Sequence, residues 1–172
     1  YEGVEIPGHG HVGLITYMRT DSTRISDEMI KQVRPYISET YGEDYLPAKP
    51  NVFSKSKEAQ DAHEAIRPTS LSFPPPALSG ILSRDQLRLY TLIWNRFIAS
   101  QMAPQIQQST SATLQCGIYT LKATGVHVLF DGFTIMQPSK KKDSEESDFL
   151  PPLKKGDIVK NTKVNGEQHF TA

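Results

Sequence analysis

The sequence predicts an α+β fold, in which a mainly helical part over about residues 1–103 is followed by an antiparallel β-rich part over about residues 104–172. Apolar residues at helical spacing, with capping signals, precede Pro104. After Pro104 the chain consists of short runs with β-branched residues, separated by glycines. A hydrophobic content of 37% and a charged content of 22% are typical of a globular protein.

The first segments predict a loop, a strand and a helix in that order. Residues 1–11 are rich in glycine and proline and predict a loop, whereas residues 12–18, VGLITYM, predict a strand. Ser26 is the expected N-cap of a helix that ends at Gly42. Pro35 lies inside this helical pattern, so we expect a kink or a break there.

Two further helices are expected before Pro104. A short one covers residues 55–65 and is stopped by Pro68. The stronger signal begins at Ser83, which forms a possible capping box with Gln86. Its apolar face is wide and predicts a buried helix; the face consists of Leu87, Tyr90, Ile93, Trp94, Phe97 and Ile98.

The β-rich part divides into short strands with glycines at the turns. The expected strands are residues 109–116, 118–124, 126–135, 157–164 and 168–172, with turns at Gly117, Gly125 and Gly166. Residues 140–148, KKKDSEESD, predict a polar loop.

Composition excludes several classes of protein. No apolar run approaches the roughly 20 residues of a membrane span, so no membrane partner is expected. Cys116 is the single cysteine, which excludes an internal disulfide and favours a cytoplasmic location. His9 and His11 have no third ligand near them in the sequence, so no metal site is predicted in this chain. With 19 basic and 19 acidic residues the net charge is zero, which counts against a strongly basic DNA-binding face.

The segment ITYMRTDST, residues 15–23, places a tyrosine and an arginine two positions apart. In a strand, Tyr17 and Arg19 point to the same face. A guanidinium favours the phenolate form of a tyrosine and binds phosphate through two nitrogens, so the pair is suited to nucleophilic attack on a phosphate. The alternative is that Tyr17 is an ordinary core tyrosine and Arg19 a solvated surface residue.

A second polar cluster lies in DAHEAIRPT, residues 61–69. It contains Asp61, His63, Glu64 and Arg67. A histidine that protonates near neutral pH and an arginine that stays charged are suited to phosphate binding and proton transfer. The alternative is a solvated helix end that the proline stops.

Together, ITYMRTDST and AHEAIRPT closely resemble the type IA DNA topoisomerases, and Met18 and Arg67 within these motifs resemble the bacterial topoisomerase I group. The resemblance continues through FIASQMAP, residues 97–104. It extends more loosely through FDGF, residues 130–133, and LPPLKKGD, residues 150–157, and so covers nearly the whole chain. Two long motifs in the expected order make this match specific.

The resemblance implies a catalytic role for Tyr17, which would attack single-stranded DNA to give a 5′-phosphotyrosine and a free 3′-hydroxyl without ATP. It implies that Arg19 holds the scissile phosphate and that His63 contacts DNA phosphate. Arg67 is assigned to phosphate binding with them. Asp21 and Glu64 are assigned to the support of these residues.

The resemblance also implies parts that this sequence lacks. In the family, Mg²⁺ is bound by acidic residues of a Toprim domain, and no such acidic cluster is found here. We therefore expect a central fragment, comprising a helical catalytic-tyrosine domain (residues 1–103) and an incomplete segment of the topoisomerase arch (residues 104–172). Its partners would be DNA and the missing Toprim and flanking domains of the same polypeptide. Alone it would be inactive. The alternative function is a non-catalytic DNA-binding or interaction module with the same fold.

Overall fold

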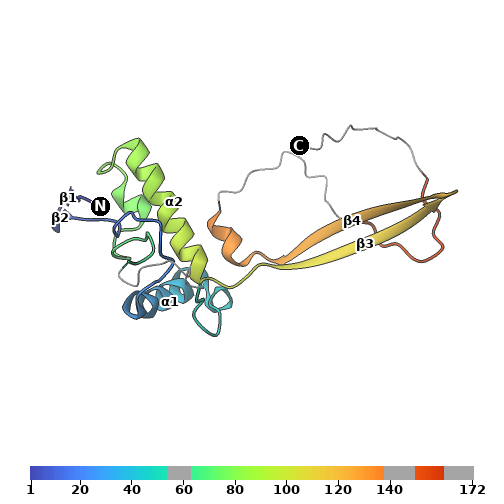
Figure 1. The fold of residues 1–172 in the computed structure, drawn as a ribbon, viewed down its shortest axis with the longest axis horizontal. Coiled ribbons are helices and arrows are strands. Elements are labelled where there is room, and N and C mark those ends of the chain that lie inside the picture. The colour runs from blue at the N-terminus through green and yellow to red at the C-terminus, as the bar shows by residue number, and fades with distance from the viewer. Residues whose placement is uncertain (54–62, 138–149, 161–172) are drawn as a thin grey trace. The chain divides into compact units, whose positions relative to one another are not determined.

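The computed structural model describes residues 1–53, 63–137 and 150–160, and the predicted α+β fold is confirmed (Figure 1). The described residues form two compact units. The first contains residues 1–53, 63–107 and 128–137, and the second contains residues 108–127 and 150–160. Within these ranges no helix is long and apolar enough to cross a membrane.

The chain begins with a β-hairpin, where a loop was expected. Strand β1 (Val4–Ile6) pairs antiparallel with β2 (Gly10–Val12) in the register Val4–Val12 and Ile6–Gly10. Gly8 and Gly10 have φ angles of 78° and 70°, which only glycine adopts easily, and this explains how so short a turn closes. The strand predicted over residues 12–18 is too long. Strand β2 ends at Val12, and residues 13–18 form only an isolated bridge, between Ile15 and Pro68.

Helix α1 (Asp27–Tyr41) follows the N-cap Ser26 and ends at Gly42, as predicted. Of the kink or break expected at Pro35, the break does not occur, since the helix continues through this residue. Proline removes one helical hydrogen bond. Val33 and Ile37 lie two positions before and two positions after the proline and are fully buried, and their packing offsets that loss.

Helix α2 (Arg84–Gln101) confirms the strongest sequence signal. The side chain of Ser83 accepts a hydrogen bond from the Gln86 backbone, and the Gln86 side chain accepts one from the Ser83 backbone. This capping box satisfies two N–H groups that the first turn leaves unpaired. Within the predicted apolar face, four residues are buried and the other two, Leu87 and Ile93, are partly buried.

The core of the first unit lies where α1 and α2 pack together (Figure 1). The rings of Tyr36 on α1 and Trp94 on α2 meet edge to face, with centroids 5.9 Å apart. Three short 3-10 helices complete this unit: η1 (Glu43–Tyr45), η2 (Pro75–Leu78) and η3 (Gly132–Met136). Buried side chains from β1, α1, η2, α2 and η3 and from the segment after β2 contribute to this core, among them Ile6, Leu14, Val33, Ile37, Leu78, Ile98 and Met136.

Residues 128–137 return from the β-rich part to the helical unit. The Tyr45 hydroxyl donates a 2.7 Å hydrogen bond to Asp131 Oδ1, and the Phe133 amide donates to the Ala103 carbonyl. Gly132 has a φ of 50°, and a Cβ there would lie 2.5 Å from the carbonyl oxygen of Pro104. The close approach of the two segments therefore requires a glycine at this position.

The second unit contains most of a two-stranded antiparallel sheet, formed by β3 (Ile106–Cys116) and β4 (Tyr119–Phe130). Gly117 forms the expected turn, with a φ of 59°. The expected turn at Gly125 is wrong, because β4 runs through it without interruption. The strand expected over residues 126–135 ends at Phe130 and is followed by η3.

Some expected elements lie partly or wholly outside the described residues. Of the helix expected over residues 55–65, residues 63–65 are not helical and the remainder is not described. Of the strand expected over residues 157–164, residues 157–160 are not in a strand. The strand expected over residues 168–172 and the loop 140–148 also lie outside the described residues.

Candidate active site around Tyr17

The two sequence motifs lie side by side in the first unit. The Thr16 amide donates to the Arg67 carbonyl at 2.9 Å, and the Thr69 amide donates to the Leu14 carbonyl at 3.0 Å. The Thr16 hydroxyl adds two contacts, because it donates to the Ala65 carbonyl and accepts from the Arg67 amide. These bonds bring Tyr17, the residue after Thr16, close to the start of the second motif.

Tyr17 lies on the surface and is 50% exposed. Its ring stacks on that of His63, with centroids 6.2 Å apart and an angle of 28° between the planes. The ring of Tyr1 meets it edge to face at 5.3 Å. This environment differs from that of the buried core tyrosine considered as the alternative, since the phenol is reachable from solvent.

Asp21 connects Arg19 with His63. Its Oδ2 lies 2.6 Å from Arg19 Nε and 3.4 Å from His63 Nδ1. The second distance is that of an ion pair, but the geometry is not that of a hydrogen bond, so we treat the contact as electrostatic. The Arg19 side chain remains 52% exposed. Four side chains predicted from the sequence (Tyr17, Arg19, Asp21 and His63) thus form one connected surface cluster.

Arg67 has a different environment from the one expected of a phosphate ligand. The residue is only 8% exposed. Its Nε and Nη2 donate to Glu64 Oε2 at 3.1 and 2.5 Å, and its Nη1 donates to the Pro68 carbonyl at 2.8 Å. Each of the three nitrogens therefore has a protein acceptor, and little of the guanidinium is open to a phosphate because the side chain is only 10% exposed. Asp61, the remaining charged residue of the second cluster, lies outside the described residues.

The described residues contain no group of three or more histidine, cysteine or carboxylate side chains that could hold a metal ion. His11 contacts Glu5 at 3.1 Å, and the His9 ring meets that of Phe73 edge to face.

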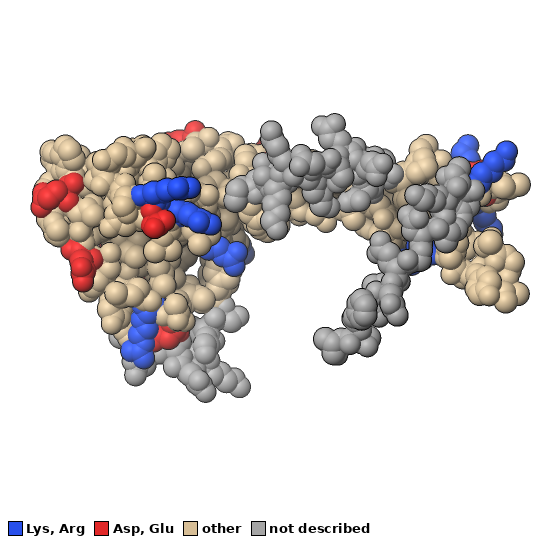
Figure 2. All heavy atoms as spheres, turned by 90° about the horizontal axis from the view of Figure 1, so that it is seen from above, with Lys and Arg blue, Asp and Glu red and all other residues tan. Residues whose placement is uncertain are grey.

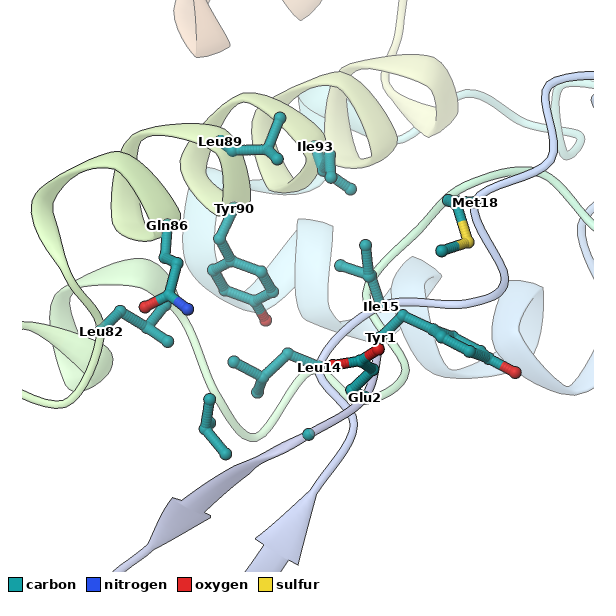
Figure 3. Close-up of a pocket in the computed structure, with 12 residues that line it drawn as sticks. Tyr1, Glu2, Leu14, Ile15, Met18, Leu82, Gln86, Leu89, Tyr90 and Ile93 are labelled. Atoms are coloured by element: carbon teal, nitrogen blue, oxygen red, sulfur yellow. The ribbon is translucent and has the colours of Figure 1, made fainter.

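A mostly apolar pocket of about 370 Å³ lies next to the Tyr17 cluster, between α2 and the segments around Tyr1 and Ile15 (Figure 3). Tyr90, Leu89 and Ile93 line it from α2, and Met18 lines the side nearest Tyr17. Sequence reasoning did not predict this pocket. The available signal was Leu89, an exposed leucine outside the expected apolar face of α2.

Acidic and basic side chains lie near one another on the face seen in Figure 2. This distribution agrees with the net charge of zero, since no single sign dominates the visible surface.

Comparison with known proteins identifies relatives along the whole chain. A family model described as DNA topoisomerase matches residues 1–172. DNA topoisomerase 1 of Pseudomonas aeruginosa and that of Vibrio cholerae are each 46% identical over 159 residues. These alignments cover 92% of this chain and 18% of each relative.

A solved structure of a topoisomerase is also similar to this chain. The full-length topoisomerase I from Thermotoga maritima, in a monoclinic crystal form, matches with a TM-score of 0.70 and 39% sequence identity. The match covers 89% of this chain and 23% of that chain, so this chain spans less than a quarter of the length of each of these three relatives. Because the family model matches every residue, the chain belongs to the DNA topoisomerase family, and it corresponds to a region of the bacterial type IA DNA topoisomerase I.

Proposed function

We propose that this chain carries the nucleophilic tyrosine of a longer type IA topoisomerase. That enzyme cleaves and rejoins single-stranded DNA through a 5′-phosphotyrosine intermediate, and relaxes negatively supercoiled DNA without ATP. The observation that carries the proposal is the exposed phenol of Tyr17 beside the connected side chains of Arg19, Asp21 and His63. Membership of the topoisomerase family supports the choice of DNA as the substrate.

The reaction we propose conserves the energy of the phosphodiester bond. The Tyr17 phenol loses its proton, and its oxygen attacks phosphorus and forms a new phosphorus–oxygen bond. The bond from phosphorus to the 3′ oxygen breaks, and that oxygen takes up a proton to become a hydroxyl. The same steps in reverse rejoin the strand, because one phosphodiester has been exchanged for another.

Arg19 is the residue best placed to stabilise this reaction. A phenol has a pKa of about 10, so attack near neutral pH needs a nearby positive charge. In this proposal the exposed guanidinium of Arg19 binds the phosphate, while Asp21 holds its Nε from the other side. His63, which stacks on the attacking ring, contacts the same phosphate.

The other parts of the enzyme lie outside this chain in our proposal. Magnesium supplies positive charge near the phosphates when bound, and its ligands belong to a Toprim domain of the same polypeptide. The described residues of this chain provide the tyrosine and its neighbours, and one segment of the arch around the DNA. Residues 1–103 form the catalytic-tyrosine domain in this assignment, and residues 104–172 the incomplete arch segment.

The test uses the longer enzyme, magnesium and a single-stranded oligonucleotide labelled at either end. A 5′ label is expected on a shortened free strand, and a 3′ label on the protein, because the tyrosine retains the 5′ phosphate. Tyr17→Phe removes the attacking oxygen and keeps the ring, so it is expected to abolish both products. If Tyr17→Phe binds the oligonucleotide normally and the wild-type protein gives no covalent product, the chain is a non-catalytic DNA-binding module.

A further inference from the structure

Arg67 and Glu64 form a buried ion pair just beyond His63 in the chain. The Arg67 side chain is 10% exposed and that of Glu64 is 23% exposed. In contrast, the side chain of Arg24, which approaches the same carboxylate at 3.8 Å, is 43% exposed. An arginine that is this buried and has a protein acceptor at each nitrogen acts mainly on its neighbours in the fold, because little of it is open to a DNA phosphate.

The acceptors of the Arg67 side chain belong to three residues in two parts of the chain. Glu64 and the Pro68 carbonyl lie within the same motif, whereas the hydroxyl of Ser26, within 3.5 Å of Nη2, is the N-cap of α1. The backbone of Arg67 also pairs in both directions with Thr16, the residue before Tyr17. The Arg67 side chain and backbone together therefore join the second motif to α1 and to the segment that carries Tyr17.

We propose that Arg67 is a positioning residue. Its pair with Glu64 holds the turn of residues 63–68 in one shape. The hydrogen bonds between residues 65–69 and residues 14–16 then place the His63 ring of this turn on Tyr17. The inference rests on the proposed function only for its effect on cleavage. It replaces the phosphate-binding role expected for Arg67 from the sequence, and it gives Glu64 a defined role as the carboxylate that orients the guanidinium.

The physical reason is that the contacts of His63 itself are weak, whereas those of the adjacent Glu64 are strong. His63 directly precedes Glu64, and it reaches the Tyr17 cluster through a ring stack and one electrostatic contact with Asp21. Neither contact is strong enough to fix a surface segment alone. The buried pair supplies a fork of directed, charge-assisted hydrogen bonds immediately beside it, which restricts the orientation of the segment.

The first experiment separates positioning from direct phosphate contact, using the longer enzyme with Arg67→Met, Arg67→Lys and Glu64→Gln. Binding to a single-stranded oligonucleotide is measured at several salt concentrations and at one fixed pH. Loss of one phosphate contact would lower the salt slope by about 0.7. If Arg67 only positions the segment, the dependence of log affinity on log salt concentration should keep the same slope in all three variants. A reduced slope for Arg67→Met would overturn the proposal.

The same variants are then tested for cleavage at saturating DNA. A small displacement of a reacting group costs up to about 100-fold, so Arg67→Met is expected to lose about 10- to 100-fold in cleavage. Arg67→Lys should recover part of this, because it keeps the charge but not the fork. The double variant Glu64→Gln/Arg67→Met should lose no more than Arg67→Met alone, whereas independent additive losses would contradict a shared function. The control is Arg88→Met, which changes an exposed arginine of α2 and should cleave normally.

A spectroscopic readout distinguishes positioning from general destabilisation. In the 172-residue chain, proton NMR contacts between the Tyr17 and His63 rings are expected in the wild type and in Arg88→Met. They should weaken or vanish in Arg67→Met and in the milder Glu64→Gln, while the signals of the buried Trp94 stay unchanged. Ring contacts that persist in both variants would refute the proposal. This readout needs no DNA, so it remains decisive if the wild-type enzyme fails to cleave and the proposed function is wrong.

Discussion

At the level of single residues, Asp21 connects the two side chains that we propose to contact the DNA phosphate. Its Oδ2 lies between Arg19 Nε and His63 Nδ1, and its side chain is 26% exposed. A partly buried carboxylate at these distances holds the guanidinium in one orientation and offsets part of its charge. The cluster is therefore arranged before any DNA arrives, which reduces the ordering that binding would require.

Arg19 is expected to be the most sensitive of these neighbours. Arg19→Ala should lower the yield of trapped covalent complex by about 100- to 1,000-fold, the range found when one charge-stabilising donor is removed from an active site. Arg19→Lys should recover only part, because lysine lacks the planar fork. The measurement is the fraction of 3′-labelled oligonucleotide that becomes attached to protein, with Arg88→Ala as the control. Wild-type yield from Arg19→Ala would remove Arg19 from the mechanism.

The sequence predicted the members of the site better than their environments. Tyr17, Arg19, Asp21 and His63 were named from two motifs, and the structure brings them together. The environment of Arg67 could not be predicted. Whether an arginine faces solvent depends on the acceptors that folding brings to it, and one of these, Ser26, lies 41 residues earlier in the chain.

At the level of elements, local signals succeeded where one segment contains both partners of an interaction. The capping box of α2 needs only Ser83 and Gln86, and both were predicted. The β1–β2 hairpin was missed because its glycines and proline resemble those of a loop. Of the kink or break expected at Pro35, the break does not occur, because packing on the core outweighs one lost hydrogen bond.

The capping box gives a prediction for stability. Ser83→Ala removes the hydroxyl that accepts from the Gln86 amide, so it should lower the free energy of unfolding by about 1 kcal/mol. Ser38→Ala is the matched control, because Ser38 lies inside α1 and its hydroxyl bonds only to the Pro35 carbonyl within the same helix. That change should stay within about 0.5 kcal/mol. Urea unfolding of both variants measures the difference, and equal losses would argue against the cap.

At the level of the whole molecule, the buried and bonded tyrosines predict sensitivity to alkali. Burial raises the pKa of Tyr90, and also that of Tyr41, where Tyr36 adds to the effect. The hydrogen bond to Asp131 raises the pKa of Tyr45. Above about pH 10 the unfolded chain therefore loses protons that the folded chain retains, and the free energy of unfolding should fall as the pH rises.

Urea midpoints at a series of alkaline pH values test this prediction. Tyr45→Phe should flatten the fall, because it removes one of the protons that the folded state retains. It should also cost some stability near neutral pH, since Asp131 loses its hydrogen-bond donor. A free energy of unfolding that rises between about pH 9 and 11 would contradict the assignment of these raised pKa values.

The small share of its relatives that this chain spans leads to a prediction about activity. It covers 18% of the length of the two curated topoisomerases, and its described residues contain no group of three or more histidine, cysteine or carboxylate side chains that could hold a metal ion. Positioning and electrostatic stabilisation by charged groups supply most of the rate in phosphoryl transfer. We therefore expect the 172-residue chain alone not to relax supercoiled DNA in the presence of magnesium. Relaxation that disappears in Tyr17→Phe would show that the chain suffices.

The most direct test of the proposed mechanism is to locate the covalent bond. The longer enzyme is incubated with a single-stranded oligonucleotide, trapped in denaturant and digested with protease and nuclease, and the modified peptide is sequenced by mass spectrometry. We predict a nucleotide 5′-phosphate attached to the Tyr17 oxygen, within the peptide that contains ITYMR. A nucleotide attached to any other residue, or cleaved DNA with no modified peptide, would contradict the assignment of Tyr17 as the nucleophile.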